Sequence, residues 1–256
     1  MSEKCFLVTG ASRGLGAAIC EELASLGHRV LATARSEEAL RKLWEETPQV
    51  HFLPSDLSET AGLETLAAEV EKRFGRLDGL VNNAGTIDPI ARLAEADPEK
   101  WARAIQVNLT APSLLMARCL PHLQKSKGRV VNISTGAAVK TMQGWSAYCA
   151  SKAGFLHLTS VAAEEYPEVA FFSLRPGVID TEMQREIRES SGMTAQDMEK
   201  FVGLKESGGL EPPEVPARSA VWLLLQGPLS RSGEFIQYTD DEVTAGVSEL
   251  FGAQLG

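Results

Sequence analysis

The chain has 256 residues, a formal net charge of -9 and a sequence pI near 5.1. Hydrophobic residues make up 44% and charged residues 23%, a balance that supports a folded core and excludes an intrinsically disordered chain. The acidic charge argues against nucleic acid or an anionic membrane as the main partner. No apolar run approaches the ~18–20 residues of a membrane span, and the first residues lack a signal-peptide pattern. We therefore expect a cytoplasmic protein without membrane contact.

The four cysteines are Cys5, Cys20, Cys119 and Cys149, and none forms a Cys-x-x-Cys pair. The four histidines show no metal-ligand spacing with them. We therefore expect neither a disulfide framework nor a metal site, and we interpret the cysteines as buried, reduced thiols.

Short β-type segments alternate with helical segments along the chain, which is the pattern of βαβ units and a parallel sheet. Strands are expected at residues 4–9, 29–34, 50–53, 79–82, 128–133, 169–175 and 234–238. Helices are expected at 14–26, 37–46, 59–73 and 214–226, and Pro98 is expected to open another. Asp56 and Ser58 are candidate caps for the helix at 59–73.

These elements predict a single doubly wound α/β domain over residues 1–256, with a parallel seven-stranded sheet flanked by helices. Only residues 181–213 interrupt the pattern, because this segment is polar, charged and punctuated by glycine and proline. Long insertions in compact domains are usually functional, so we interpret 181–213 as a lid over a substrate. The tail after Asp240 has only weak helical character.

A glycine-rich turn follows the first expected strand, as Thr9-Gly10-Ala11-Ser12-Arg13-Gly14-Leu15-Gly16. Glycines let the backbone turn tightly and approach a pyrophosphate, and the next helix supplies free N–H groups and a positive dipole end. Such a turn alone is weak evidence, but its place between a strand and a helix is typical of a dinucleotide site.

The end of the second expected strand indicates which dinucleotide is bound. It reads Ala32-Thr33-Ala34-Arg35-Ser36, without the acid that NAD-binding folds use to bind the ribose hydroxyls. Arg35 and Arg13 would suit a 2′-phosphate, which a carboxylate would repel. We therefore predict NADP(H) as the cofactor, with two ordinary solvated charges as the alternative.

Tyr148 and Lys152 are the main candidates for chemistry. They lie four residues apart, which places both side chains on one face of a helix. They follow the fifth strand, at the sheet edge where such folds bind ligands, and Ser134-Thr135 end that same strand. Asn108 lies in the preceding helical segment, where its side chain could order a water.

Taken together, these motifs resemble those of the single-domain short-chain dehydrogenases/reductases. The resemblance extends from Lys4 to about Tyr238 and implies one NAD(P)-binding Rossmann domain. Further matches are Asp56, which is implied to meet the adenine, and Asn82-Asn83-Ala84-Gly85, of which the last three residues are implied to pack along the cofactor. Pro176-Gly177 is another match, followed by Val178, Ile179 and Thr181, which are implied to hold the nicotinamide amide. Asn132, inside the fifth strand, is interpreted as structural.

The cofactor-binding residues expected on these grounds are Gly10, Ser12, Arg13, Gly14, Leu15, Gly16, Arg35, Asp56, Leu57, Asn83, Ala84, Gly85, Tyr148, Lys152, Pro176, Gly177, Val178, Ile179, Thr181 and Met183.

Residues 144–152 and 180–184 are similar to those of sepiapterin reductases and the related benzil (diketone) reductases. Sepiapterin reductases hold the pterin through a carboxylate in the last strand, where this chain has Gln237. The neutral amide favours a dicarbonyl or other small ketone over a pterin side chain. The candidates for substrate contact are Trp145, Met142, Met183 and Gln237; for the first three, ordinary core packing is the alternative.

The resemblance implies that NADPH reduces a carbonyl group, with Tyr148 protonating the alkoxide. A free tyrosine has a pKa of about 10. Lys152, together with a cationic nicotinamide, is expected to lower the pKa of Tyr148 and to hold the ribose hydroxyls. Thr135, thirteen residues before Tyr148, is expected to orient the carbonyl, with Ser134 in support. A shift of one residue would exchange those two roles.

Other functions share these motifs. A 3-oxoacyl-carrier-protein reductase and a polyol dehydrogenase belong to the same family, and a catalytically silent NADP-sensing regulator is the alternative from another class. Family members commonly pair the two long helices that precede and contain Tyr148. A homodimer or homotetramer is therefore expected, with a small carbonyl compound as the other partner.

Overall fold

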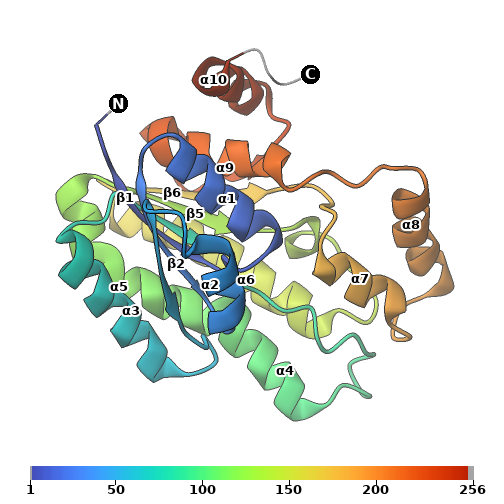
Figure 1. Ribbon diagram of the computed structural model, residues 1–256. Helices are drawn as coiled ribbons and strands as arrows, with labels where there is room; N and C mark the ends of the chain where they lie inside the picture. The colour runs from blue at the N-terminus through green and yellow to red at the C-terminus, as the bar shows by residue number, and fades with distance from the viewer. Residues whose placement is uncertain (1, 253–256) are drawn as a thin grey trace.

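The computed structural model describes residues 2–252 and contains a seven-stranded sheet in the order β3-β2-β1-β4-β5-β6-β7 (Figure 1). All neighbouring strands are parallel. The strands are β1 (Cys5–Thr9), β2 (Arg29–Ala34), β3 (Val50–Pro54), β4 (Gly79–Asn82), β5 (Arg129–Ile133), β6 (Ala170–Arg175) and β7 (Phe235–Gln237). The predicted doubly wound, seven-stranded fold is thus confirmed.

Helices cover both faces of the sheet (Figure 1). One apolar core joins the sheet to α1 (Gly14–Ser25), α2 (Glu37–Trp44) and α9 (Glu214–Gln226). A second core joins the other face to α3 (Thr60–Phe74), α5 (Ala111–Ser126) and α6 (Ser146–Glu165). Burial on both faces explains why strands such as β1 read as continuous apolar runs. The remaining helices are α4 (Pro98–Ile105), α7 (Glu182–Glu189), α8 (Ala195–Glu206) and α10 (Asp241–Phe251), with a π-helical turn at Gln106–Thr110 and 3₁₀ turns at Gly136–Ala138 and Leu229–Arg231.

Each strand and each bounded helix expected from the sequence is present, with ends that differ by no more than two residues. The predicted capping of α3 is wrong. Its N-cap is Glu59, which makes no side-chain hydrogen bond to the helix. The Asp56 carboxylate instead accepts a hydrogen bond from the Ser58 backbone N–H at 2.9 Å, which is the bond of an Asx turn.

A hydrogen-bond network inside the sheet holds α6 in place. Asn82 Nδ2 donates to Asn132 Oδ1 at 2.8 Å, and Asn132 Nδ2 donates to Thr159 Oγ1 of α6 at 2.9 Å. All three residues are buried, so these bonds satisfy groups that water cannot reach. The structural interpretation of Asn132 is confirmed, and the network ties the helix that carries Tyr148 to β4 and β5.

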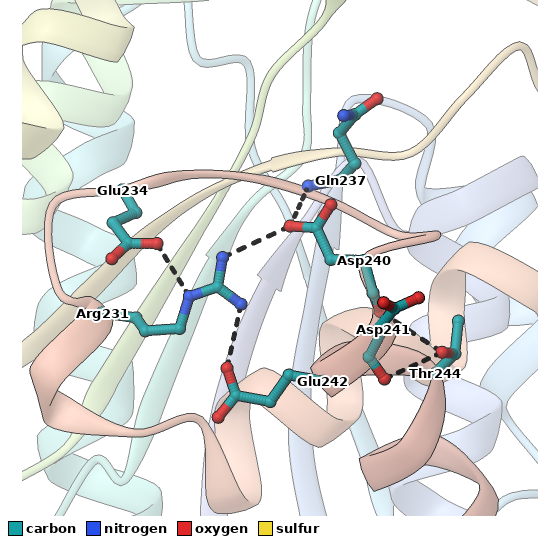
Figure 2. Close-up of polar contacts among 7 residues, drawn as sticks. All are labelled: Arg231, Glu234, Gln237, Asp240, Asp241, Glu242 and Thr244. Atoms are coloured by element: carbon teal, nitrogen blue, oxygen red, sulfur yellow. Dashed lines mark hydrogen bonds and ion pairs between the residues drawn. The ribbon is translucent and has the colours of Figure 1, made fainter.

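An ionic cluster connects the last strand to α10 (Figure 2). The Arg231 guanidinium lies 2.7 Å from Glu234, 3.3 Å from Asp240 and 3.1 Å from Glu242. Asp240 also accepts a hydrogen bond from the Gln237 backbone N–H at 3.2 Å. The cluster therefore sets the direction of the chain as it leaves β7.

The helix α10 forms where the sequence showed only weak helical character, and it packs on the outer side of α9 (Figure 1). Val243 and Val247 are buried there. A Cβ added at Gly246 would lie 2.1 Å from Trp222 Nε1 of α9. The two helices can approach this closely only because residue 246 has no side chain.

Gly246→Ala is therefore expected to destabilise the protein. The added methyl would force the Trp222 ring or α10 to move, a kind of overpacking that typically costs about 1–3 kcal/mol in the free energy of unfolding. Chemical denaturation measures the change. Gly203→Ala in α8 is the matched control, because a Cβ there has no heavy atom within 4 Å. An equal loss in both variants would contradict the packing argument.

Candidate active site

A cavity of about 1520 Å³ lies along the carboxyl edge of the sheet and brings together most of the residues predicted for the site. Of the predicted residues, Gly16, Asn108 and Gln237 are not part of its wall. Those in the wall are Gly10, Ser12, Arg13, Gly14, Leu15, Arg35, Asp56, Leu57, Asn83, Ala84, Gly85, Ser134, Thr135, Met142, Trp145, Tyr148, Lys152, Pro176, Gly177, Val178, Ile179, Thr181 and Met183.

The glycine turn fits a dinucleotide. Gly10 has φ +69°, and a Cβ there would lie 2.7 Å from Asn83 Nδ2. A Cβ at Gly14, which has φ +53°, would lie 3.2 Å from Thr181 Cγ2, so this turn faces the loop after β6. Gly16 lies behind the cavity wall, where its missing side chain allows contact with the Gly10 carbonyl. Side chains at Gly10 and Gly16 would clash with the turn itself and with the loop after β4, so the glycines allow the tight turn that a pyrophosphate site needs.

The end of the cavity beside β2 is positively charged. Arg13 and Arg35 both line it, and within residues 2–252 neither forms an ion pair with a carboxylate. Asp56 lies 3.4 Å from Arg103. Burial acts to raise the pKa of Asp56, but hydrogen bonding to Ser58 and the nearby arginines lower it below its usual value. Asp56 is therefore ionised. The guanidinium groups of Arg13 and Arg35 remain able to bind an anion.

Tyr148 and Lys152 share one face of α6 and are 8% and 5% exposed. Lys152 Nζ donates to the Ile133 carbonyl at 2.7 Å, and burial lowers its pKa to about 8. Burial raises the pKa of Tyr148 to about 12, while hydrogen bonding to the Thr135 side chain acts in the opposite direction. Tyr148 is thus a neutral phenol at physiological pH.

The expected lowering of the Tyr148 pKa by Lys152 is not produced by the protein's own groups. Lys152 Nζ lies 6.0 Å from the centroid of the Tyr148 ring, and burial is the largest influence on the tyrosine. The protein itself therefore favours the protonated phenol. A proton donor in carbonyl reduction must start in that form.

The two hydroxyls that follow β5 have different surroundings. The Thr135 side chain lies close enough to Tyr148 to act against the rise of its pKa, and the Thr135 hydroxyl accepts a hydrogen bond from the Ala137 backbone N–H at 3.3 Å. Ser134 is 6% exposed, and its Oγ has no hydrogen-bond partner among residues 2–252. The position of Thr135 beside Tyr148 supports the assignment in which Thr135, rather than Ser134, orients a substrate.

The role expected for the Asn108 side chain is wrong. Its Oδ1 accepts from the Thr86 N–H at 2.8 Å, and its Nδ2 donates to the Thr86 carbonyl at 2.8 Å and to Ser151 Oγ at 3.2 Å. These bonds fix the loop after β4 to α6, and the side chain is buried away from the cavity wall, so it does not order a water there.

Gln237 does not contact the cavity, contrary to expectation. It is exposed at the end of β7, where its Oε1 accepts a hydrogen bond from Arg175 Nη1 at 3.1 Å. Arg175 itself lines the cavity. Gln237 therefore contacts Arg175 of the cavity wall, a residue that the motifs had not indicated, and not the cavity itself.

An aromatic wall forms the other end of the cavity. The Trp145 ring meets the edge of Tyr148 with centroids 5.7 Å apart, and it stacks on Phe201 at 5.6 Å. The wall also contains the predicted Met142 and Met183 with the buried Ile87 and Ile187. Phe201, Ile87 and Ile187 were missed by the sequence analysis because none belongs to a motif or has a fixed spacing from Tyr148.

The predicted lid segment, 181–213, contains α7 and α8. Ile187 of α7 and Phe201 of α8 pack against the aromatic wall, and Lys205 pairs with Asp180 at 2.7 Å. The loop between the helices crosses another loop very closely, because a Cβ at Gly192 would lie 2.0 Å from the Ile90 carbonyl. The segment thus forms one wall of the cavity, where a lid over a substrate would lie.

Two other expectations concern the rest of the chain. No helix within residues 2–252 is long and apolar enough to cross a membrane. Cys5, Cys20 and Cys119 are buried thiols, as expected, whereas Cys149 is half-buried beside the aromatic wall.

The chain matches the family model of short chain dehydrogenases over residues 4–192. It is 36% identical to a benzil reductase ((S)-benzoin forming) of Saccharomyces cerevisiae, over 94% of this chain and 97% of that protein. A crystal structure of a short chain dehydrogenase/reductase from Saccharomyces cerevisiae is 35% identical, with a TM-score of 0.91 over 94% of this chain and 98% of that chain.

An alcohol dehydrogenase from the archaeon Thermococcus sibiricus, complexed with 5-hydroxy-NADP, is 28% identical, with a TM-score of 0.77 over 92% of this chain and 96% of that chain. The seven-stranded parallel sheet agrees with these matches. The protein therefore belongs to the short-chain dehydrogenase family, in the branch that contains the benzil reductases, and is an oxidoreductase that acts on carbonyl or hydroxyl groups.

Proposed function

We propose that the protein uses NADPH to reduce a small ketone or diketone with an apolar, aromatic body. One observation carries the proposal: the buried Tyr148, held as a neutral phenol beside Thr135, lies between a dinucleotide cradle and the aromatic wall. A proton donor placed there meets the oxygen of a carbonyl whose apolar body fills the pocket. The identity to a benzil reductase supports the same substrate class.

The preference for NADPH rests on Arg13 and Arg35, which line the cavity without carboxylate partners among the described residues. A phosphate dianion is the group that two guanidiniums bind best. The similar dehydrogenase complexed with 5-hydroxy-NADP supports this choice. When bound, the cofactor supplies the hydride.

The residues of this chain have separate tasks. The Thr135 hydroxyl donates a hydrogen bond to the carbonyl oxygen and fixes the carbonyl against Tyr148. Tyr148 Oη then gives its proton to that oxygen as negative charge develops on it. Lys152 holds the ribose hydroxyls and, as a cation, stabilises the phenolate that remains. The aromatic wall and the 181–213 lid exclude water from the reacting atoms.

A substrate panel with each cofactor tests the proposal. Benzil, 1-phenyl-1,2-propanedione, acetophenone, a pterin ketone and a polyol would be assayed with NADPH, NADH or their oxidised forms. We expect the highest kcat/KM for an aromatic diketone with NADPH. Oxidation of the polyol with NAD+ as the fastest reaction, or no turnover of any carbonyl, would contradict the proposal.

The choice between Thr135 and Ser134 at the end of β5 gives a first prediction. Thr135→Val keeps the shape but removes the hydroxyl, so turnover is expected to fall by about 10²-fold or more, as for loss of an oxyanion donor. Ser134→Ala is expected to change turnover much less, because Ser134 Oγ has no hydrogen-bond partner among residues 2–252. Steady-state kinetics with one ketone compares them. The opposite order of effects would exchange the two roles.

The pH dependence gives a second prediction. Lys152, with a pKa of about 8, is a cation below that pH and neutral above it. We expect kcat/KM for reduction to be level in the acidic range and to fall as the pH rises through about 8. Tyr148 stays protonated in this range, because its pKa is about 12. Lys152→Arg retains its charge, so its weaker activity should not fall near pH 8; a fall there would assign it to another group.

We also propose that copies of the chain assemble through α5 and α6 into a homodimer or homotetramer, in the cytoplasm. Val161 on α6 is an exposed apolar residue, and Leu114, Leu120 and Leu158 of these helices are only partly buried. Apolar surface of this kind is typical of an interface between copies. Sedimentation equilibrium would measure the mass, and a monomer would contradict the proposal.

A further inference from the structure

The inner face of α7 carries two polar side chains with unsatisfied buried atoms. Gln184 is 8% exposed, and its Oε1 has no hydrogen-bond partner among residues 2–252. Arg188 Nη1 is also buried and without a partner in the same part of the chain. Both residues line the cavity. Because they lie four residues apart, they share one face of the helix.

This pair lies at the substrate end of the cavity. Ile187, the neighbour of Arg188, is 2% exposed and packs in the cluster that contains Trp145 and Tyr148. Met183, the neighbour of Gln184, packs against the same cluster. The face of α7 that carries Gln184 and Arg188 therefore adjoins the face that packs on the aromatic wall.

The charges of the cavity wall do not balance. Eleven lysines and arginines line it, against five aspartates and glutamates, although the whole chain carries a net charge of -9. Four of these acids already pair with cations of the same wall. The fifth, Glu186, is on the exposed side of α7. No carboxylate within residues 2–252 forms an ion pair with Arg188.

A buried N–H group without an acceptor costs free energy, and folded proteins rarely keep one without a reason. A carboxylate is the ligand that matches a guanidinium, because its two oxygens accept the parallel N–H groups of the planar fork. The Gln184 amide can rotate to present its NH₂ group to the same ligand. A neutral ketone oxygen could accept one of these N–H groups, but it would neither match the two-pronged guanidinium nor balance its charge.

We propose that Arg188, assisted by Gln184, binds a carboxylate of the substrate at a position away from the reacting carbonyl. The substrate would then be a keto acid with an apolar, aromatic body between its two polar ends. The assignment of a carbonyl as the reacting group rests on the proposed function. The carboxylate subsite does not, because binding to it can be measured without turnover.

A matched pair of ketones tests the subsite. Benzil and its para-carboxy derivative, carboxybenzil, have the same reacting dicarbonyl and differ by one carboxylate. In the unmodified protein, kcat/KM is expected to be higher for carboxybenzil. Arg188→Gln is expected to raise the Michaelis constant for carboxybenzil about tenfold or more and to change that for benzil less than about twofold. Arg188→Lys should restore part of the loss.

Arg41→Gln is the control variant. Arg41 lies on the exposed side of α2, pairs with Glu37 at 2.7 Å and is not part of the cavity wall, so this change should affect neither ketone. An equal rise of both Michaelis constants in Arg188→Gln would show a structural role and overturn the proposal. The absence of any preference for carboxybenzil in the unmodified protein would also overturn it.

A carboxylate without a reducible carbonyl separates this proposal from the proposed function. Calorimetry with the NADP+-loaded protein should show that para-benzylbenzoate binds, that its methyl ester binds much more weakly, and that Arg188→Gln weakens the acid about tenfold. This pattern without turnover of any ketone would refute the proposed function and leave the subsite standing. Unchanged binding of the acid in Arg188→Gln would overturn the subsite. A lower NADPH affinity without weaker acid binding would assign Arg188 to the cofactor and overturn it too.

Discussion

Tyr148→Phe is expected to abolish nearly all carbonyl reduction, with turnover lower by about 10²–10⁴-fold, the usual contribution of a general acid. The ring would remain, so its edge-on contact with Trp145 at 5.7 Å would remain too. Only the hydroxyl beside Thr135 is lost, and with it the proton for the alkoxide. NADPH affinity should change little, because the glycine turn and the two arginines are untouched.

Single-turnover kinetics with NADPH-loaded protein measures this loss, and fluorescence titration measures NADPH binding separately. Tyr166→Phe is the matched control, because Tyr166 follows the same helix α6 and is not part of the cavity wall. It should retain full activity. Near-normal turnover in Tyr148→Phe would remove the proposed mechanism, whereas a combined loss of NADPH binding and turnover would show that the substitution damaged the cradle.

Arg35→Asp is expected to reverse the cofactor preference. The new carboxylate would repel the 2′-phosphate of NADPH, and it could accept hydrogen bonds from the ribose hydroxyls of NADH. Loss of one charge-assisted interaction typically corresponds to roughly tenfold or more in affinity, and reversal of the charge adds repulsion. The kcat/KM for NADPH should fall accordingly, and that for NADH should rise.

The ratio of kcat/KM for the two cofactors, measured with one ketone, is the readout. Lys42→Asp changes the net charge by the same amount from the exposed surface of α2 and is not part of the cavity wall, so it controls for the long-range field. Equal kcat/KM values for both cofactors in the unmodified protein would contradict the assignment of Arg13 and Arg35 to a phosphate.

The fold could be predicted because its signals are local. The strands appear as short apolar runs, since a parallel sheet buries both faces of each strand. The glycine turn and the Tyr148/Lys152 pair depend on φ values and on helical spacing, which act within a few residues. The strand order then brings these motifs to one edge without any further information.

The predictions that failed all concern the use of a side chain rather than its place in the chain. Asn108 was expected to order a water, but its amide is occupied by Thr86 and Ser151. Gln237 was expected to contact the substrate, but it holds Arg175 instead. A polar side chain is free for function only when no neighbour already satisfies it, and neighbours distant in sequence decide that.

The sequence by itself determined the family, the dinucleotide cradle and the candidate proton donor, because each depends on a motif of fixed local spacing. Only the tertiary structure decided that burial raises the pKa of Tyr148 and that Phe201 closes the aromatic wall. It also left Arg188 without an acceptor among the described residues. Burial and unsatisfied polar atoms depend on contacts between segments far apart in the chain, and no local pattern records those contacts.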